Sequence, residues 1–283
     1  MSRLQALHLS AAHGRRFALL HEPDSAPRGL VLHVHAFAKE MNKARRMVAL
    51  QARALAQNGL AVLVPDLYGC GDSDGDFGDA TWAHWLDDTV AAAAWLRARH
   101  PAASGELWLW GLRAGALLAS QAAASLPEPA HLMLWQPASA GKPLLQQFLR
   151  LKMAAELQGG GKGITEALKH ELAQGRSVHI AGYTLHPALA CGLEQAVLMA
   201  PAPGMRTLWF EVAAQADAEL LPASVRTLTM WRELGLTPSS EVTSGPAFWQ
   251  TSEIEDAPKL VDATCRALRQ TVRTKLAVAS TLA

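Results

Sequence analysis

Apolar runs and segments of helical periodicity alternate along the first half of the chain. Four continuous apolar runs are typical of strands buried on both faces: Gly29–His35, Leu60–Asp66, Glu106–Trp110 and His131–Gln136. Apolar residues at helical spacing predict three helices between these runs: Asn42–Gln57, Trp82–Arg99 and Ala114–Ser125. This alternation predicts an α/β fold with a doubly wound, mostly parallel sheet and right-handed crossovers.

The pattern also predicts sheet strands near both ends of the chain. Leu4–Leu9 and Arg15–His21 surround a short turn, and we expect them to form an antiparallel sheet edge. Apolar segments return at Arg206–Val212 and near Ser240–Trp249, before a closing amphipathic helix at Ala257–Thr274. The sheet is therefore expected to take strands from both ends of the sequence.

The strand–helix alternation is interrupted after Pro137. Helical spacing predicts Gly141–Gln158 and Ile164–Gln174, joined by a flexible glycine-rich link. Because this insertion follows a central strand, we expect a helical lid above the sheet. The expected parts are the first part of the core at 1–136, the lid at 137–205 and the last part of the core at 206–283.

Composition narrows the classes of function. The chain has 283 residues, is 50% hydrophobic and has a formal net charge of +1, so no nucleic-acid partner is expected. The start MSRLQALHLS lacks the apolar core of a signal peptide, and no apolar run is long enough for a membrane span. Three cysteines far apart indicate free thiols in a reducing compartment, so we expect a cytoplasmic protein. The oligomeric state stays open.

No metal or cofactor is expected from the motifs. The cysteines lack metal-ligand spacing, and the GKG at Gly161-Lys162-Gly163 follows no strand and precedes no Ser or Thr, unlike a phosphate-binding loop. His33 and His35 lie at i and i+2 on one strand face, where they could form half of a metal site or take structural hydrogen bonds. The structural role is the simpler interpretation.

The central motif lies in Glu106–Ser120, ELWLWGLRAGALLAS. An apolar strand leads into Gly111-Leu112-Arg113-Ala114-Gly115 and leaves as a small-residue helix, which is the arrangement of a G-x-S-x-G nucleophile elbow. The glycines two positions on either side are kept because a Cβ there would collide with the turn. Arg113 stands where the motif has serine.

With the elbow in place, the chain resembles the α/β-hydrolase superfamily along nearly its whole length. His35-Ala36-Phe37 resembles its His-Gly-Phe oxyanion loop, and residues 66–73 resemble its D-x-x-G-x-G-x-S segment. Within the superfamily the chain is similar to the exosortase A system-associated hydrolase 2 group, a resemblance carried by residues 37–43, 112–115, 135–137, 181–183 and 248–251. That resemblance implies a genomic setting beside a bacterial system for surface-protein sorting and exopolysaccharide synthesis.

The resemblance implies roles for particular residues. The backbone N–H groups of Phe37 and Ala114 correspond to the oxyanion donors, with His35 in the same loop. Asp217 lies about where the triad acid is expected, although a solvated loop aspartate is an equal alternative. The triad histidine should follow that acid, but no histidine occurs after His186, and Ser244–Trp249 stands in its place. Serine-triad hydrolysis is therefore not expected.

Other residues around the elbow are candidates for ligand contacts. Lys39, Glu40 and Asn42 follow the oxyanion loop and could line the pocket mouth or simply be solvated residues at a helix start. Trp249, near the missing histidine, is expected at the pocket rim. We therefore predict ligand contacts from Lys39, Asn42 and Trp249.

Arg113 has three possible roles. At the first turn of a helix its charge opposes the helix dipole, so it should need an anionic partner. That partner could be an internal acid, with Asp66, Asp217 or Glu253 as candidates, or a ligand carboxylate or phosphate. Direct catalysis by the arginine is the third possibility.

These alternatives define two hypotheses of function. The residues favour a protein that binds an anionic or acylated small ligand, with an acyl-carrier species among the candidates, and performs no chemistry. The resemblance favours an ester or thioester hydrolase or acyl transferase that uses Arg113 and Asp217 in a mechanism without serine.

Overall fold

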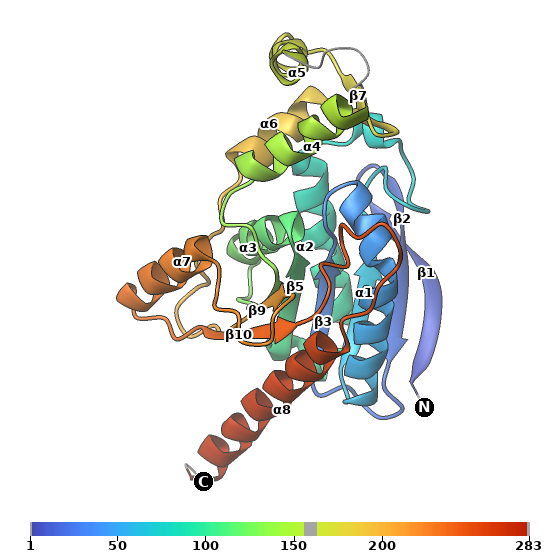
Figure 1. Ribbon diagram of the computed structural model, residues 1–283. Coiled ribbons are helices and arrows are strands. Elements are labelled where there is room, and N and C mark those ends of the chain that lie inside the picture. Colours follow the sequence, from blue (N-terminus) through green and yellow to red (C-terminus); the bar gives the residue numbers. More distant parts are fainter. Residues whose placement is uncertain (1, 156–162, 282–283) are drawn as a thin grey trace.

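The computed structural model describes residues 2–155 and 163–281 and contains an eight-stranded sheet (Figure 1). The strand order is β1-β2-β4-β3-β5-β6-β9-β10. Only the β1–β2 and β2–β4 pairs are antiparallel, which confirms the predicted α/β fold with its antiparallel edge. The strands are β1 Arg3–Ala11, β2 Gly14–Glu22, β3 Leu30–Val34, β4 Ala61–Pro65, β5 Leu107–Leu112, β6 His131–Trp135, β9 Thr207–Ala213 and β10 Ser239–Ser244.

Helices cover both faces of the sheet. Helices α1 and α8 pack on one face, and α2, α3 and α7 pack on the other (Figure 1). Their bounds are α1 Lys39–Gln57, α2 Trp82–Arg99, α3 Ala114–Ser125, α7 Pro222–Glu233 and α8 Pro258–Thr281. Two short 3-10 turns, η1 Phe77–Asp79 and η2 Pro101–Glu106, precede α2 and β5.

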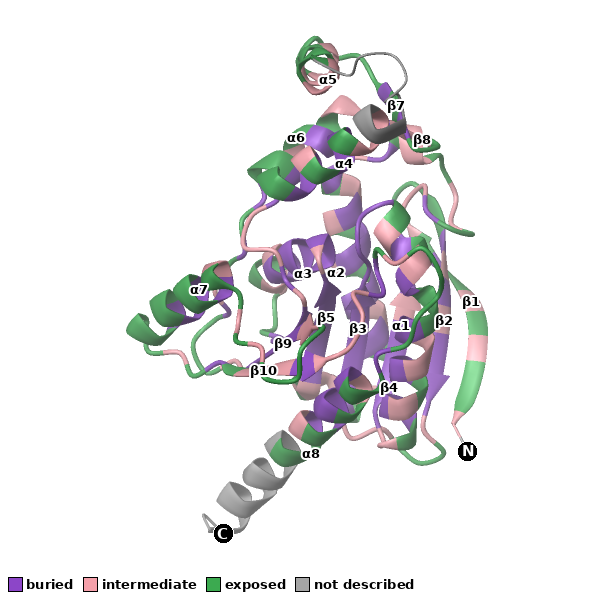
Figure 2. Cartoon of the chain, viewed as in Figure 1, coloured by how far each residue is buried: buried purple, intermediate pink, exposed green. Residues whose placement is uncertain are grey.

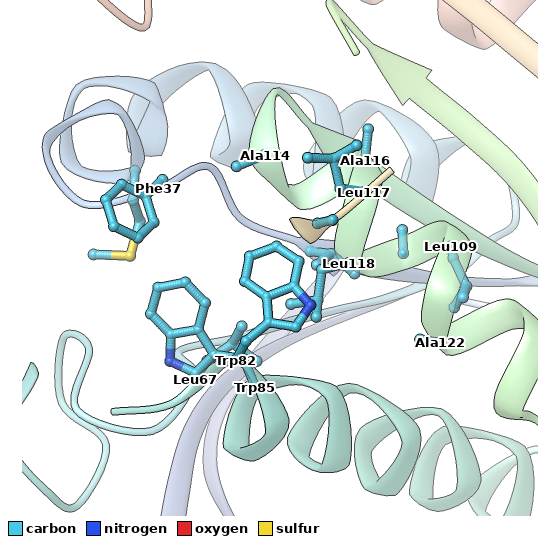
Figure 3. Packing of buried hydrophobic residues seen from close by; sticks show 14 of the residues in the cluster. Phe37, Leu67, Trp82, Trp85, Leu109, Ala114, Ala116, Leu117, Leu118 and Ala122 are labelled. Carbon is cyan, nitrogen blue, oxygen red and sulfur yellow. The ribbon is translucent and has the colours of Figure 1, made fainter. Parts of the chain in front are cut away.

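The central strands are apolar because neither of their faces meets water. Every residue of β3, β5 and β6 is buried (Figure 2), as expected for parallel strands between two helical layers. Side chains that alternate along these strands divide the core into two clusters, one under α1 and α8 and one under α2 and α3. Figure 3 shows the second cluster, where Trp82 and Trp85 of α2 face the small side chains of α3.

The segment between β6 and β9 forms a layer at one end of the molecule (Figure 1). It contains helices α4 Lys142–Ala155, α5 Ile164–Ala173 and α6 Pro187–Gln195, together with a short hairpin of β7 Val178–Ile180 and β8 Tyr183–Leu185. The predicted end of the first lid helix and most of the glycine-rich link lie outside the described residues. The hairpin was not predicted, because its strands are too short for a periodic signal.

Two differences from the expected elements affect the site. Helix α7 was not predicted; it begins with Pro222 and buries Leu228 and Trp231 against the sheet. The last strand ends at Ser244 and does not continue to Trp249, since the chain leaves the sheet and buries Phe248 and Trp249 instead. No helix among the described residues has the length and apolarity needed to cross a membrane.

The two glycines of the elbow permit a very close contact between elements. A Cβ on Gly115 would lie 2.1 Å from the Val34 carbonyl oxygen and 2.5 Å from that of His35. A Cβ on Gly111 would lie 2.5 Å from Cα of Ala116. Such distances are far below van der Waals contact, so the start of α3 rests directly on the backbone that follows β3.

Replacement of Gly115 by alanine should therefore destabilise the protein. We expect Gly115→Ala to lower the free energy of unfolding by about 2–3 kcal/mol, because backbone atoms cannot move aside as a side chain can. Gly105→Ala is the matched control, since a Cβ there has no neighbour within 4 Å. Urea denaturation of both variants checks this expectation, and equal stabilities would contradict the contact.

Candidate functional site

Arg113 adopts the strained backbone of a nucleophile elbow. Its φ of 56° and ψ of −116° lie in a region that residues with a side chain rarely occupy, at a cost of about 1–3 kcal/mol. The Arg113 N–H donates to the Trp135 carbonyl at 3.1 Å, which ties the turn to β6. Ala38, immediately before α1, has nearly the same dihedral angles, φ 48° and ψ −119°. Helices α1 and α3, which follow β3 and β5, therefore each begin after a residue in this conformation.

The charge partner of Arg113 is Glu40, in the first turn of α1. The guanidinium Nη2 lies 3.2 Å and Nε 3.3 Å from Glu40 Oε1. Nη2 also donates to Gln147 Oε1 of α4 at 3.1 Å, and the guanidinium carbon lies 5.7 Å from the centre of the Trp249 ring. This last distance allows a cation–π contact. The Arg113 and Glu40 side chains are only 15% and 18% exposed, so the pair is largely shielded from water.

The acids proposed as partners from the sequence lie elsewhere, so that prediction was wrong. Asp66 accepts hydrogen bonds from Arg45 at 3.0 Å and from the Asp72 N–H at 3.1 Å. Asp217 is exposed in the turn after β9, and Glu253 is exposed beyond Trp249. Neither Asp217 nor Glu253 lines the cavity next to Glu40.

Burial raises the pKa of Glu40 above its usual value of 4.5. The charge of Arg113 and its hydrogen bonds lower the pKa, but by less than burial raises it. Glu40 is therefore a carboxylate that takes a proton more readily than an exposed glutamate does.

The backbone donors of the oxyanion loop and the elbow are not used inside the described chain. Neither the Phe37 N–H nor the Ala114 N–H donates a hydrogen bond to another described residue. The close contact at Gly115 brings the two loops together. The Phe37 ring lies near Trp85 in the core (Figure 3), with their ring centroids 5.8 Å apart. Its centroid also lies 5.1 Å from that of Phe148 of α4. These two backbone N–H groups are thus unpaired within the described residues.

A cavity of about 110 Å³, here called the front pocket, lies between the start of α1, helix α4 and the loop after β10. Two of its lining residues, Glu40 and Gln147, are the ones that contact Arg113. Its volume is below the ~300–1,000 Å³ of typical small-molecule sites, so a ligand that fills it in this conformation is compact. Half of the surrounding side chains are apolar, and the other half are two lysines, two glutamines and Glu40. They are Phe37, Lys39, Glu40, Lys43, Leu144, Gln147, Phe148, Leu151, Trp249 and Gln250.

The structure separates the residues predicted to bind the ligand. Phe37, Lys39 and Trp249 line the front pocket, although Trp249 is buried and not at an open rim. Asn42 does not line it, and its Nδ2 donates instead to the Tyr183 hydroxyl of β8 at 2.9 Å. The His35 ring lies in a different cavity, behind the oxyanion loop.

The roles of Glu40 and Gln147 were missed in the sequence. Glu40 had been considered only as a pocket-mouth residue beside Lys39. A single signal could have identified it as the partner, since it is the one acid in the first turn of α1. Gln147 lies on an exposed face of α4, and nothing in its sequence context indicates a contact with the elbow.

No histidine occupies the position of the triad base. The segment after β10 places Phe248 and Trp249, 1% and 4% exposed, beside the elbow region. An indole ring donates a hydrogen bond but cannot take a proton from a nucleophile. Among the described residues, no three or more histidine, cysteine or acidic side chains are arranged to hold a metal ion.

Comparison with known proteins gives the same fold. A family model described as serine aminopeptidase, S33 (Hydrolase_4) matches residues 25–174. A structure of Est1E from Butyrivibrio proteoclasticus with ferulic acid bound is 19% identical, covers 95% of this chain and 100% of its own, and has a TM-score of 0.68. XC6422 from Xanthomonas campestris, a serine hydrolase without a lid, is 19% identical, covers 95% and 94%, and has a TM-score of 0.55. No curated protein matches the sequence.

The raised pKa of Glu40 predicts that this residue destabilises the folded protein in a pH-dependent way. Because the folded protein holds the Glu40 proton more tightly than the unfolded chain, Glu40 lowers stability as the pH rises from about 4.5 through its folded pKa. Glu40→Gln removes this titration, so its stability relative to wild type should improve as the pH rises above about 4.5.

Urea denaturation across that pH range measures the difference. Glu194→Gln, at an exposed position of α6, controls for the loss of one negative charge. If wild type instead gains stability relative to Glu40→Gln as the pH rises, the attraction of Arg113 outweighs burial.

Proposed function

The chain belongs to the Hydrolase_4 (serine aminopeptidase, S33) family of α/β-hydrolases, and from this premise we propose that it binds a compact acylated or anionic ligand at the elbow. The serine-triad reaction of such a scaffold is absent because Arg113 stands in place of the serine and no histidine follows His186. The protein is thus a hydrolase scaffold used for binding.

The observation that carries this proposal is the elbow itself. The strained turn, the glycine contact and the two unused N–H groups are all present around Arg113. These groups are backbone features, so they can hold a carbonyl or carboxylate oxygen whatever side chain stands at position 113. A carboxylate or carbonyl head near the elbow would meet these donors and the guanidinium together.

The walls of the front pocket suit an apolar chain attached to that head. Leu144, Phe148 and Leu151 of α4 face Phe37 and Trp249 across the pocket. Lys39 is exposed beside it and adds positive charge at the mouth. A short acyl group with an anionic head or an anionic carrier, such as a phosphopantetheine thioester, matches both features.

Glu40 couples this binding to a proton. A ligand anion that contacts Arg113 competes with Glu40 for the guanidinium. Because burial already raises the pKa of Glu40, the displaced carboxylate takes up a proton more easily than an exposed one. Affinity for an anion should therefore increase as the pH falls toward the Glu40 pKa.

The biological ligand is proposed from the resemblance to the exosortase A system-associated hydrolase 2 group. In that setting the ligand is an acylated or anionic intermediate of exopolysaccharide synthesis or surface-protein sorting. The ferulic acid bound to Est1E, a carboxylic acid on a similar fold, supports the choice of a carboxylate as the first ligand class to test.

Glu40 also supports a second candidate function, hydrolysis without serine. A carboxylate with a raised pKa can accept a proton from water, and the Phe37 and Ala114 N–H groups could hold the oxyanion that forms. In this alternative Glu40 replaces Asp217 as the acid of the mechanism, since Asp217 is exposed and outside the front pocket.

A fluorophosphonate probe and an ester substrate distinguish the two functions. We expect that the probe labels no serine. We also expect that any hydrolysis of p-nitrophenyl butanoate is the same in wild type and in Glu40→Gln. Serine labelling would contradict the loss of the triad. Turnover that falls at least tenfold in Glu40→Gln, about 1.4 kcal/mol of barrier, would establish the alternative.

Ligand binding itself is tested by thermal stabilisation with butanoate, butanoyl-phosphopantetheine and, as a neutral match, butan-1-ol. The two anionic ligands should raise the melting temperature of wild type. Arg113→Ala should weaken their binding about tenfold or more, because a charged hydrogen-bond donor is lost.

Arg150→Ala, on an exposed position of α4, is the control for removal of a positive charge near the pocket. Equal stabilisation of the Arg113 and Arg150 variants would mean that Arg113 does not hold the ligand. Equal stabilisation by butan-1-ol and butanoate would mean that the head group is not recognised.

A further inference from the structure

A second cavity, here called the rear cavity, lies between helix α1 and strands β2, β3 and β4. Its volume is about 220 Å³, roughly seven times the ~30 Å³ that a water molecule occupies in the liquid. Ala44 and Ala49 face it from α1, and their small side chains leave the space open against the sheet. It shares no lining residue with the front pocket.

Three buried histidines, His21, His33 and His35, line the rear cavity, and the last two have incomplete hydrogen bonding. His33 is 2% exposed and His35 is 6% exposed. The Nδ1 atom of His33 and the Nε2 atom of His35 have no hydrogen-bond partner among the described residues. Buried polar atoms are nearly always paired, so two such atoms beside one cavity indicate a ligand.

The existing hydrogen bonds decide what these nitrogens can do. His35 Nδ1 lies 2.8 Å from the Ala36 carbonyl oxygen, which only accepts, so Nδ1 carries the ring proton. In the neutral ring Nε2 is then an acceptor. The His33 ring makes a hydrogen bond to the Trp110 backbone that raises its pKa, as donation to a carbonyl does. Its unpaired Nδ1 is therefore an acceptor as well.

Burial keeps both rings neutral at physiological pH. Burial, with a smaller contribution from the neighbouring His35, lowers the pKa of His33 to about 3. Burial also lowers the pKa of His35, against the opposing effects of its bond to Ala36 and the charge of Asp66. Both nitrogens thus stay acceptors and require donors from a ligand.

The remaining walls restrict the ligand further. Met41, Val48 and Val64 present apolar surface to the cavity. Asp66 contributes a carboxylate that is paired with Arg45 at 3.0 Å, and Arg45 is half exposed at the rim. Two acceptor nitrogens and a carboxylate disfavour an anion, and the apolar walls disfavour a fully polar molecule.

From these contacts we infer that the rear cavity is a binding site for a small, neutral, ring-sized molecule with an apolar body and at least two hydroxyl or N–H donors. One donor pairs with His33 Nδ1 and the other with His35 Nε2. The site is independent of the ligand proposed for the elbow.

A graded series of probes tests the need for two donors. Resorcinol has two hydroxyl groups, 3-methoxyphenol has one and 1,3-dimethoxybenzene has none, on the same ring. By calorimetry and saturation-transfer NMR, we expect resorcinol to bind and each lost donor to weaken binding about fivefold. Equal affinity for the three probes, or no resorcinol binding at about 10 mM, would overturn the inference.

Variants locate the binding. Ala44→Leu should abolish resorcinol binding by filling the cavity, whereas Ala54→Leu, on the same helix but outside the cavity, should retain it. His33→Phe keeps the bulk against Trp110 and removes one acceptor, so it should weaken binding about fivefold even if Ala44→Leu fails to fold. Undiminished binding by a folded Ala44→Leu, or by His33→Phe, would exclude this site.

Discussion

The contact of Gly115 with the Val34 and His35 carbonyls is the constraint on which the site depends. It fixes the start of α3 against the loop after β3, so the conformation of residue 113 follows from backbone packing and not from its side chain. The elbow therefore survives the replacement of serine by arginine. What changes is the electrostatics, because a cation now projects from the positive end of a helix and needs a nearby anion.

Glu40 is that anion, and Gln147 and Trp249 also contact the guanidinium. The three residues come from three separate segments. The carboxylate comes from the first turn of α1, the amide from α4 and the indole from the loop after β10. The ion pair with Glu40 compensates the permanent charge of Arg113. An anion that binds to Arg113 can therefore change the protonation state of Glu40.

The sequence predicted the fold well because its signals are local. Strands buried on both faces and helices of regular spacing were found, as was the elbow, whose glycines are sterically required. The partner of Arg113 could not be found in this way. Glu40 lies 73 residues away, and only the adjacency of β3 and β5 brings the two helix starts together. The place of His35 depends on the same geometry, since its ring packs behind the loop whose backbone faces the elbow.

The oxyanion loop is also the wall between the two cavities. Ala36 and Met41 face the rear cavity, whereas Phe37, Lys39 and Glu40 face the front pocket. A ligand that shifts this segment from one side changes the shape offered to a ligand on the other. Thermodynamic linkage then requires the effect to be reciprocal. If a ligand in the rear cavity changes the affinity of the front pocket by some factor, a ligand in the front pocket changes the affinity of the rear cavity by the same factor. The six residues of backbone at 36–41 would set the sign and size of that coupling.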